Sequence, residues 1–344
     1  MPVTPRLPPP ALPSPRQRSQ ATPGEFALID KYFTRPGRRA AAVELGVGDD
    51  CALLRVASGM QLAVSSDMLV EGRHFLSTVA PEYLGHKALA VNLSDLAACG
   101  AEPLAFTLAL ALPRADDAFL AAFSRGLFAL ADAHGIELVG GDTTAGPLNI
   151  CITVFGQLPP GQALLRSGAQ VGDELWVSGR LGDARLALEV FRGRIALPGD
   201  GFEQVRPAME QPQPRVALGQ ALRGLASSAI DLSDGLLGDL GHVLQRSGVA
   251  AWVDVDALPR SAVMATQPPA LQHECLLAGG DDYELLFTAP TRHHAAVREA
   301  AQRVGVAVAC VGAVVANGSP ALRVVDGQGR PVTTPWRSFD HFEP

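Results

Sequence analysis

Residues 81–100 read PEYLGHKALAVNLSDLAACG, and this stretch sets the architecture of the chain around it. Ala and Leu fall on most sides of a helix drawn over residues 82–98, so we expect that helix to be well buried. Pro81 near the first turn and Gly100 just past the last are typical helix boundaries. The polar residues inside the apolar run then need partners, and these are Lys87, Asn92, Ser94 and Asp95.

The composition is that of a globular protein. The chain has 344 residues, of which 47% are hydrophobic and 18% charged, and this length suffices for two ordinary domains. No run approaches the roughly 20 apolar residues of a membrane span, so no membrane partner is expected. The net charge of −7 argues against a broad electrostatic surface for nucleic acid.

The cysteines point to a reducing compartment. They are far apart, odd in number and without a CxxC pair, which argues against a disulfide framework or a zinc site. We therefore expect a cytoplasmic protein. The five are Cys51, Cys99, Cys151, Cys275 and Cys310.

The chain divides near Pro159-Pro160-Gly161, where the pattern of strands and helices breaks. Strand and helix patterns interleave on both sides of this point, so we expect an α/β (or α+β) class with two units of similar size. The units are residues 24–158 and 159–344. Residues 1–23 are Pro-rich without an apolar signal-peptide core, and we expect a disordered tail.

Five short segments repeat one design, in which small residues precede an aspartate near the end of an expected strand. Strands over 61–66 and 136–139 would place Asp67 and Asp142 just past their ends. The segments are Gly48-Asp49-Asp50, Ser65-Ser66-Asp67, Gly140-Gly141-Asp142, Asp231-Leu232-Ser233-Asp234-Gly235 and Gly279-Gly280-Asp281-Asp282.

Two interpretations of these aspartates remain open. Magnesium prefers hard oxygen ligands and is usually held by one or two carboxylates together with substrate phosphates, while small neighbours let phosphates approach closely. Alternatively, aspartates after strands form turns and cap helices. That alternative fits poorly at Asp95, where a carboxylate inside an apolar helix is costly unless paired or metal-bound. The sequence has no GxxxxGK[ST] loop and no GxGxxG turn, so ATP would bind by another route.

Other polar residues also carry two interpretations. His74 either faces a substrate or packs at the surface, and Arg166 either binds phosphate or is simply exposed. Lys87 either neutralises Asp95 or extends towards solvent. Ser233 is predicted to cap a helix over 234–246, and a capped helix N-terminus is also a natural phosphate site.

Seven runs, in order along residues 24–344, resemble the thiamine-monophosphate kinase family. Any one run would be weak, but the ordered set is specific. The runs are Gly46-Val47-Gly48-Asp49-Asp50-Cys51-Ala52, Ser66-Asp67-Met68-Leu69-Val70-Glu71-Gly72-Arg73-His74-Phe75, Ala90-Val91-Asn92-Leu93-Ser94-Asp95-Leu96-Ala97-Ala98-Cys99-Gly100-Ala101, Gly140-Gly141-Asp142-Thr143-Thr144, Ser233-Asp234-Gly235-Leu236, Asp282-Tyr283-Glu284-Leu285-Leu286-Phe287 and Phe339-Asp340-His341-Phe342.

The resemblance implies the two-domain fold of the aminoimidazole ribonucleotide synthetase superfamily, with N-terminal domains that pair into a homodimer. It implies ATP and several Mg2+ ions, thiamine monophosphate as acceptor and thiamine diphosphate as product. It assigns metal binding to Asp49, Ser65, Ser66, Asp67, Asp95, Asp142, Asp231 and Asp234. It assigns ATP binding to Gly141, Asp142, Arg166 and Ser233, and substrate binding to His74, Asp281 and Phe339.

One departure concerns the substrate side, because the family commonly has glutamate where Asp281 stands, and aspartate is one methylene shorter. Two rivals to the kinase remain. A purine-pathway ATP-dependent ligase of the same superfamily would lack the Glu71-Gly72-Arg73-His74-Phe75 run. A sensor that binds nucleotide or thiamine phosphate without turnover would not need every metal aspartate. For the kinase we expect direct in-line transfer without a phosphoenzyme, and no catalytic residue beyond the metal and phosphate ligands.

Overall fold

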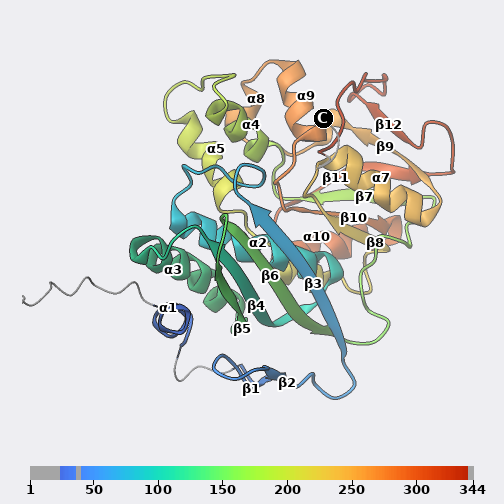
Figure 1. Cartoon of the computed structure of the whole chain (residues 1–344). Helices are drawn as coiled ribbons and strands as arrows, with labels where there is room; N and C mark the ends of the chain where they lie inside the picture. Colours follow the sequence, from blue (N-terminus) through green and yellow to red (C-terminus); the bar gives the residue numbers. More distant parts are fainter. Residues whose placement is uncertain (1–23, 36–39, 340–344) are drawn as a thin grey trace, which may run out of the picture.

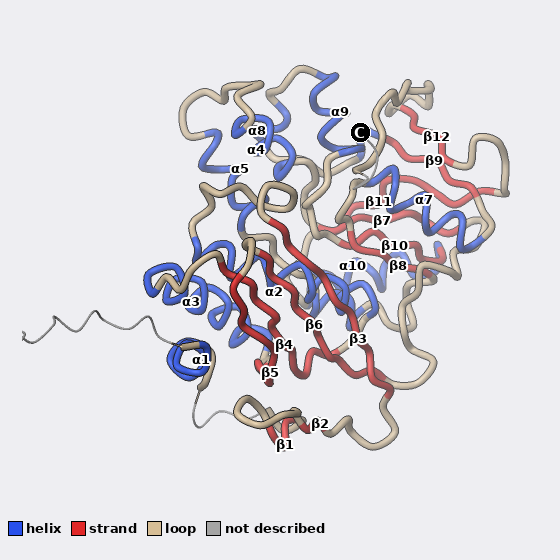
Figure 2. The backbone as a smooth tube through the Cα atoms, in the orientation of Figure 1, coloured by secondary structure: helices blue, strands red, loops and turns tan. Residues whose placement is uncertain are grey.

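The computed structural model describes residues 24–35 and 40–339. The tail predicted to be disordered, residues 1–23, lies outside these ranges. The described chain forms a four-stranded sheet, a six-stranded sheet and a small two-stranded sheet, with helices packed around them (Figures 1 and 2). The predicted mixed α/β class is confirmed. Within the described ranges, no helix has the length and apolar character needed to cross a membrane.

The strands are β1 (Val43–Leu45), β2 (Leu53–Leu54), β3 (Gln61–Val70), β4 (Glu102–Leu112), β5 (Glu137–Ala145), β6 (Asn149–Leu158), β7 (Asp173–Ser178), β8 (Ser228–Asp231), β9 (Ala250–Asp254), β10 (Leu285–Pro290), β11 (Val308–Val315) and β12 (Leu322–Val325). The helices are α1 (Glu25–Tyr32), α2 (Pro81–Cys99), α3 (Asp117–His134), α4 (Asp183–Phe191), α5 (Gly201–Glu210), α6 (Val216–Ala221), α7 (Leu236–Ser247), α8 (Ala262–Ala265), α9 (Pro269–Ala278) and α10 (His294–Arg303), with 3-10 turns at Val255–Ala257 and Thr291–His293.

The four-stranded sheet has the order β3-β6-β4-β5, and β4 and β5 run parallel because α3 connects them. Helices α2 and α3 lie behind this sheet in Figure 1. On β3 the side chains of Leu62, Val64 and Met68 alternate onto one face and are each about half exposed. The second sheet has the order β12-β9-β11-β7-β10-β8. The change of sheet falls between Leu158 and Asp173, and the domain bounds 24–158 and 159–344 stay a prediction.

Helix α2 lies between the two sheets. Pro81 occupies its first turn, and Gly100 ends it in the left-handed conformation with a φ of 71°, as the sequence predicts. The helix contacts α3, β3 and β6 on one side and β8 and α6 on the other. One cluster of buried side chains extends from α2 to Trp176 and Phe287 of the second sheet. The expectation of a helix buried on most sides is therefore confirmed.

The local expectations for Asp67, Asp142 and Ser233 were wrong. Asp67 and Asp142 lie inside β3 and β5 and not past their ends, because both strands continue by several residues. The helix expected from 234 begins at Leu236, and no side chain caps it through Ser233. Instead the Asp239 carboxylate accepts hydrogen bonds from the backbone N–H groups of Asp234 (3.2 Å) and Gly235 (3.1 Å). An acidic side chain in the first turn therefore accepts from the two backbone N–H groups just before the helix.

The close approach of α2 and α3 depends on a glycine and gives a stability prediction. A Cβ atom on Gly126 would lie 1.8 Å from the Glu82 carbonyl oxygen, so Gly126→Ala forces the helices apart. We expect a loss of about 1–3 kcal/mol in unfolding free energy, measured by urea denaturation.

The matched control is Gly241→Ala in α7, where an added Cβ meets no atom within 4 Å. There alanine gains helix propensity, and stability should stay the same or rise by up to about 1 kcal/mol. Equal stabilities of the two variants would contradict the described packing of α2 on α3.

Candidate functional site

Four of the predicted metal ligands come together where α2 meets both sheets. Asp67 comes from β3, Asp95 from α2, Asp231 from the last position of β8, and Asp234 from the turn before α7. Asp95 and Asp231 line one cavity. After burial, the charges of Asp95 and Asp234 contribute to the raised pKa of Asp67, and those of Asp95 and Asp67 contribute to the raised pKa of Asp231. This set, Asp67, Asp95, Asp231 and Asp234, is called the carboxylate cluster below.

Burial dominates the electrostatics of the cluster. Burial, reinforced by neighbouring negative charge, raises the pKa of Asp67 to about 6. Burial followed by the charge of Asp95 raises the pKa of Asp231, which is 5% exposed. Burial also raises the pKa of the Asp239 carboxyl to about 7. Both effects disfavour the charged carboxylates, so a cation bound here would stabilise them.

Hydroxyl and amide groups around the cluster satisfy the polar residues of α2. Ser94 Oγ donates to the Asp231 carboxylate at 2.7 Å, and Asn92 Oδ1 accepts from the backbone N–H of Asp67 at 3.0 Å. Ser65 Oγ donates to the Asp95 carboxylate. These bonds explain why a buried helix carries Asn92, Ser94 and Asp95.

The two serines before Asp67 point in different directions. Ser65 lines a small cavity of about 270 Å3 together with Asp95, Arg166 and Asp231. Ser66 Oγ instead bonds to Thr153 Oγ1 at 2.9 Å, across the sheet. The structure therefore brings the hydroxyl of Ser65 to the cluster but not that of Ser66, because alternate residues of a strand face opposite sides.

Arg166 is exposed and lines the same cavity as Asp95 and Asp231. Its positive charge opposes the rise in the pKa of Asp95, and it likewise opposes the rise at Asp239. An exposed guanidinium beside buried carboxylates is suited to bind the phosphate groups of a ligand that sits over a metal.

The donor set fits magnesium bound together with phosphate. Within residues 24–35 and 40–339, no group of three or more His, Cys, Asp or Glu side chains is arranged to hold one ion. Magnesium commonly takes one or two carboxylates and completes its octahedron with waters and phosphate oxygens. Buried carboxylates that repel one another, with an arginine beside them, have the chemistry for such a shared arrangement.

The remaining metal and nucleotide candidates of the first unit lie elsewhere. Asp49, in the turn between β1 and β2, lines a cavity of about 690 Å3 with Gly141 and Asp142 of β5 and with residues of α1. Gly141 has a φ of 143°, and a Cβ there would lie 1.8 Å from the Leu108 carbonyl oxygen. This position therefore requires glycine. Asp49, Gly141 and Asp142 are called the β5 group below.

Strand register separates the β5 group from the carboxylate cluster within one chain. Asp67 pairs with Ile152, which pairs with Leu108, which pairs with Gly141. Three strand spacings correspond to about 14 Å. The same register sets Asp142 in a row with Met68, whose half-exposed side chain lies on the other face from Asp67. The sequence did not predict this separation, because spacing along the chain carries no information on register.

The three substrate-side candidates lie near the turn before α7. The backbone N–H of Asp281 donates to the Ser233 carbonyl at 2.9 Å, and that of Phe339 donates to the Asp234 carbonyl at 3.1 Å. His74, in the loop after β3, reaches the same region through Lys87. Lys87 Nζ donates to the His74 carbonyl at 3.2 Å and forms an ion pair with Asp281 at 3.0 Å. The structure thus brings Ser233, Asp281 and Phe339 together beside Asp234, and Lys87 links the His74 backbone to Asp281.

The partner expected for Lys87 was wrong. It neither neutralises Asp95 nor extends to solvent, since its side chain is 3% exposed and pairs with Asp281. Residues 87 and 95 are eight positions apart, about 12 Å along a helix, which a lysine beside its own helix does not span. Helix geometry alone could have excluded the first interpretation, but the partner from a distant loop had no sequence signal.

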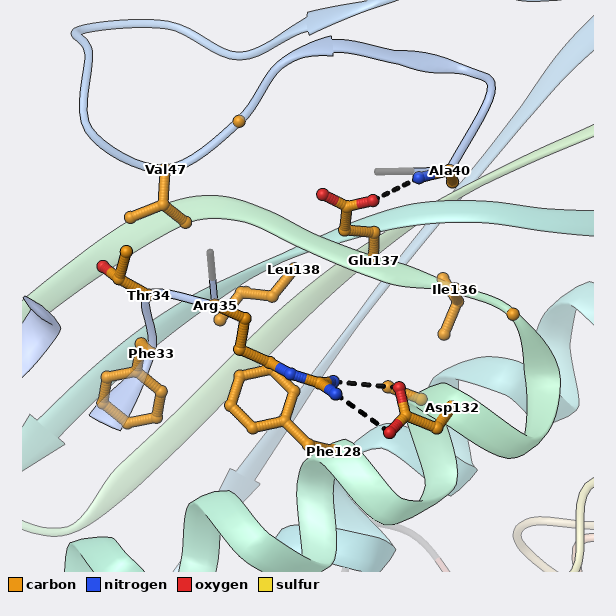
Figure 3. A pocket seen from close by; sticks show the side chains of 13 residues that line it. Phe33, Thr34, Arg35, Ala40, Val47, Phe128, Asp132, Ile136, Glu137 and Leu138 are labelled. Carbon is orange, nitrogen blue, oxygen red and sulfur yellow. Dashed lines mark hydrogen bonds and ion pairs between the residues drawn. The ribbon is translucent and has the colours of Figure 1, made fainter. Parts of the chain in front are cut away.

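A further cavity of about 290 Å3 adjoins the β5 group and shares Phe33, Thr34, Val47 and Leu138 with its cavity. Figure 3 shows Arg35 above the Phe128 ring with both guanidinium bonds to Asp132, at 2.9 and 3.0 Å. Glu137 accepts from the Ala40 backbone N–H. These contacts hold the chain before β1 against α3 and β5, and none of the predicted site residues lines this cavity.

Comparisons with known proteins show which proteins this chain resembles. The chain matches the AIR synthase related protein N-terminal domain over residues 48–158 and the corresponding C-terminal domain over residues 170–325. It is 47% identical to thiamine-monophosphate kinase of Salmonella typhimurium over 93% of this chain and 98% of that protein.

Solved structures of similar proteins extend the comparison. Thiamine-monophosphate kinase from Stenotrophomonas maltophilia is 44% identical, with a TM-score of 0.79 over 85% of this chain and 93% of that one. The complex of AaThiL with AMPPCP and TMP is 28% identical, with a TM-score of 0.72 over 84% of this chain and 89% of that one.

The repulsion inside the carboxylate cluster gives a second prediction. Replacing Asp67 by Asn removes one buried charge among like charges, so the melting temperature of protein stripped of divalent ions with EDTA should rise at pH 8. Differential scanning fluorimetry at low salt measures the shift, and added MgCl2 should shrink the advantage of the variant.

The control variant is Asp326→Asn. That carboxylate accepts hydrogen bonds from the backbone of Gln328 and Arg330, and these bonds lower the pKa of Asp326. Its charged form is therefore favoured in the fold, and the melting temperature should fall or stay unchanged. A loss of stability in Asp67→Asn as well would contradict repulsion within the cluster.

Proposed function

This chain belongs to the thiamine-monophosphate kinase family, within the AIR synthase related proteins, and from this premise we propose that it transfers the γ-phosphoryl group of ATP directly to the phosphate of thiamine monophosphate. The observation that carries the proposal is the convergence of four carboxylates beside Arg166 and the substrate-side residues. A relative complexed with AMPPCP, an ATP analogue, and with TMP supports both substrates.

The chemistry explains why carboxylates outnumber basic groups here. The acceptor is a phosphate monoester oxygen, already ionised near neutral pH, so no strong general base is needed. The obstacle is repulsion between two phosphates, about 4 kcal/mol for each pair of unit charges 4 Å apart at an effective dielectric of 20. Charge neutralisation and alignment are therefore the main tasks of the site.

The residues of the chain divide these tasks. Asp67, Asp95, Asp231 and Asp234 would hold magnesium, together with the hydroxyl of Ser65 and a main-chain oxygen of Ser66. Magnesium held by these residues would supply positive charge that offsets the repulsion between the phosphates. Arg166 binds nucleotide phosphate, Ser233 fixes the turn beside it, and His74, Asp281 and Phe339 orient the acceptor.

The β5 group completes the site from a second copy of the chain. Asp49, Gly141 and Asp142 lie about 14 Å from Asp67 within one chain, by three strand spacings. A homodimer that pairs the uncovered faces of two four-stranded sheets buries Leu62, Val64 and Met68. Because β3 is an edge strand of its sheet, the β5 group of one copy would reach the cluster of the other around that edge, and a two-fold axis repeats the contact.

One assay tests the function and separates its rivals. Wild-type protein incubated with ATP, magnesium and thiamine monophosphate should form thiamine diphosphate, and none should form when EDTA is present. Product formation from formylglycinamidine ribonucleotide instead would establish the purine-pathway ligase, and binding without turnover would establish the sensor. Direct transfer also predicts that rapid quenching traps no phosphate on the protein, so a phosphorylated Asp or His would refute that step.

Mixing two inactive variants tests the shared site. Asp67→Asn and Asp142→Asn should each lose about 100-fold or more in turnover, because each removes a stabiliser of transferred charge. When the two are unfolded together, refolded and assayed at equal amounts, half of the dimers contain both chains, and each has one intact site. About a quarter of wild-type activity should return.

The control is a mixture of Asp67→Asn with Asp95→Asn, which both alter the carboxylate cluster of their own chain. That mixture leaves every site damaged and should recover nothing. Absence of recovery in the first mixture, with dimers present by light scattering, would rule out a composite site.

A further inference from the structure

Lys87 is a buried cation whose position the phosphoryl-transfer chemistry leaves unexplained. Its side chain is 3% exposed on α2, and burying an ammonium is costly unless it is paired. It is paired twice, with the Asp281 carboxylate at 3.0 Å and the His74 carbonyl at 3.2 Å. Both contacts lead to residues on the acceptor side of the site, and neither leads to the carboxylate cluster.

The loop that carries Asp281 has an unusual backbone conformation that neighbouring residues stabilise. Asp281 and Tyr283 have positive φ angles of 67° and 48°, a left-handed conformation that non-glycine residues rarely adopt. The backbone N–H groups of the two residues donate to the Ser233 and Leu232 carbonyls at 2.9 and 2.8 Å. The surrounding turn therefore stabilises a backbone shape that these residues would not favour alone.

The carboxylate of Asp281 is fixed at both oxygens. Tyr283 Oη donates to one oxygen at 3.1 Å, and Lys87 Nζ pairs with the other at 3.0 Å. The Asp281 side chain is still 30% exposed, while Tyr283 is buried. The carboxylate thus has a fixed direction and an accessible surface, which suits recognition of a polar or cationic ligand group.

Lys87 also joins parts of the chain that come from the two sheets. His74 follows β3 of the four-stranded sheet, whereas Asp281 precedes β10 of the six-stranded sheet. A single ammonium holds the two segments at a set distance. Because aspartate is short, its reach towards a ligand depends on where the loop is held.

We propose that Lys87 is a positioning residue for the acceptor: it fixes the Asp281 carboxylate and the His74 loop in the arrangement that binds thiamine monophosphate, while leaving nucleotide binding unaffected. The inference rests on the proposed function and deepens it, since it assigns acceptor selectivity to a residue whose described contacts are with Asp281 and His74. The cationic thiazolium ring and the aminopyrimidine amine of the acceptor are the groups that such a carboxylate recognises.

The test is a split between the two substrates in Lys87→Met, which keeps the length and apolar stem of the side chain. The KM for thiamine monophosphate should rise about 10-fold or more, the size expected when a charge-assisted hydrogen bond is lost. The KM for ATP should change by less than about twofold. Lys31→Met, at an exposed ion pair with Asp117, is the matched control and should change neither KM.

A double-mutant cycle with Asp281→Asn tests whether Lys87 acts through the Asp281 carboxylate. If Lys87 acts through Asp281, the double variant should be no worse in its thiamine monophosphate KM than the worse single variant. Multiplying effects of the two changes would overturn the proposal, as would equal rises in both KM values of Lys87→Met.

Tyr283→Phe keeps the test available if Lys87→Met does not fold. It removes a single hydrogen bond to the same carboxylate and should raise the KM for thiamine monophosphate alone, with a melting temperature near that of wild type. An unchanged acceptor KM in this variant would overturn the proposal in that case.

Calorimetric binding of thiamine monophosphate separates this inference from the function itself. Wild-type binding without turnover, weakened in Lys87→Met, would refute the kinase activity and support the role of Lys87. Turnover by wild type with an unchanged acceptor affinity in Lys87→Met would support the kinase activity and refute the role of Lys87. A wild-type protein that neither binds nor converts thiamine monophosphate would refute both.

Discussion

The burial of α2 between two sheets is the constraint on which the site depends. A helix covered on both sides leaves little water for its polar side chains, so buried ones need partners on neighbouring elements. Ser94 donates a hydrogen bond to Asp231 of β8, and Asn92 accepts one from the backbone of β3. Lys87 forms an ion pair with Asp281 in the loop before β10. The same contacts that satisfy the helix therefore place residues from distant parts of the chain around one point.

That arrangement places function and stability in opposition. Asp67 and Asp231 have raised pKa values because burial and like charge disfavour their ionised forms. A core without these charges would be more stable, since buried carboxylates contribute only when their charge is compensated. Their presence is understandable if the compensating charge arrives with the ligands, as magnesium and phosphate would bring it.

The sequence predicts the helices and strands of this site better than it predicts how they pair and which side chains meet. The bounds of α2 follow from local patterns, as Pro81 and Gly100 illustrate, and so does the occurrence of small residues before the aspartates. Register and distant pairing do not. The separation of Asp142 from Asp67 depends on three strand pairings, and the partner of Lys87 depends on how a loop nearly two hundred residues later returns to α2.

The N-terminus of α7 shows why contacts between distant segments cannot be predicted from the local sequence. Ser233 has the expected residue type for a cap, yet Asp239 satisfies the donors and leaves the Ser233 carbonyl to accept from Asp281. A serine cap and an acidic side chain in the first turn are both common at a helix N-terminus. The one adopted also holds the Asp281 loop, whose backbone requires support at two left-handed residues. The choice between two adequate local arrangements thus depends on another segment, the loop that carries the carboxylate we propose for acceptor binding.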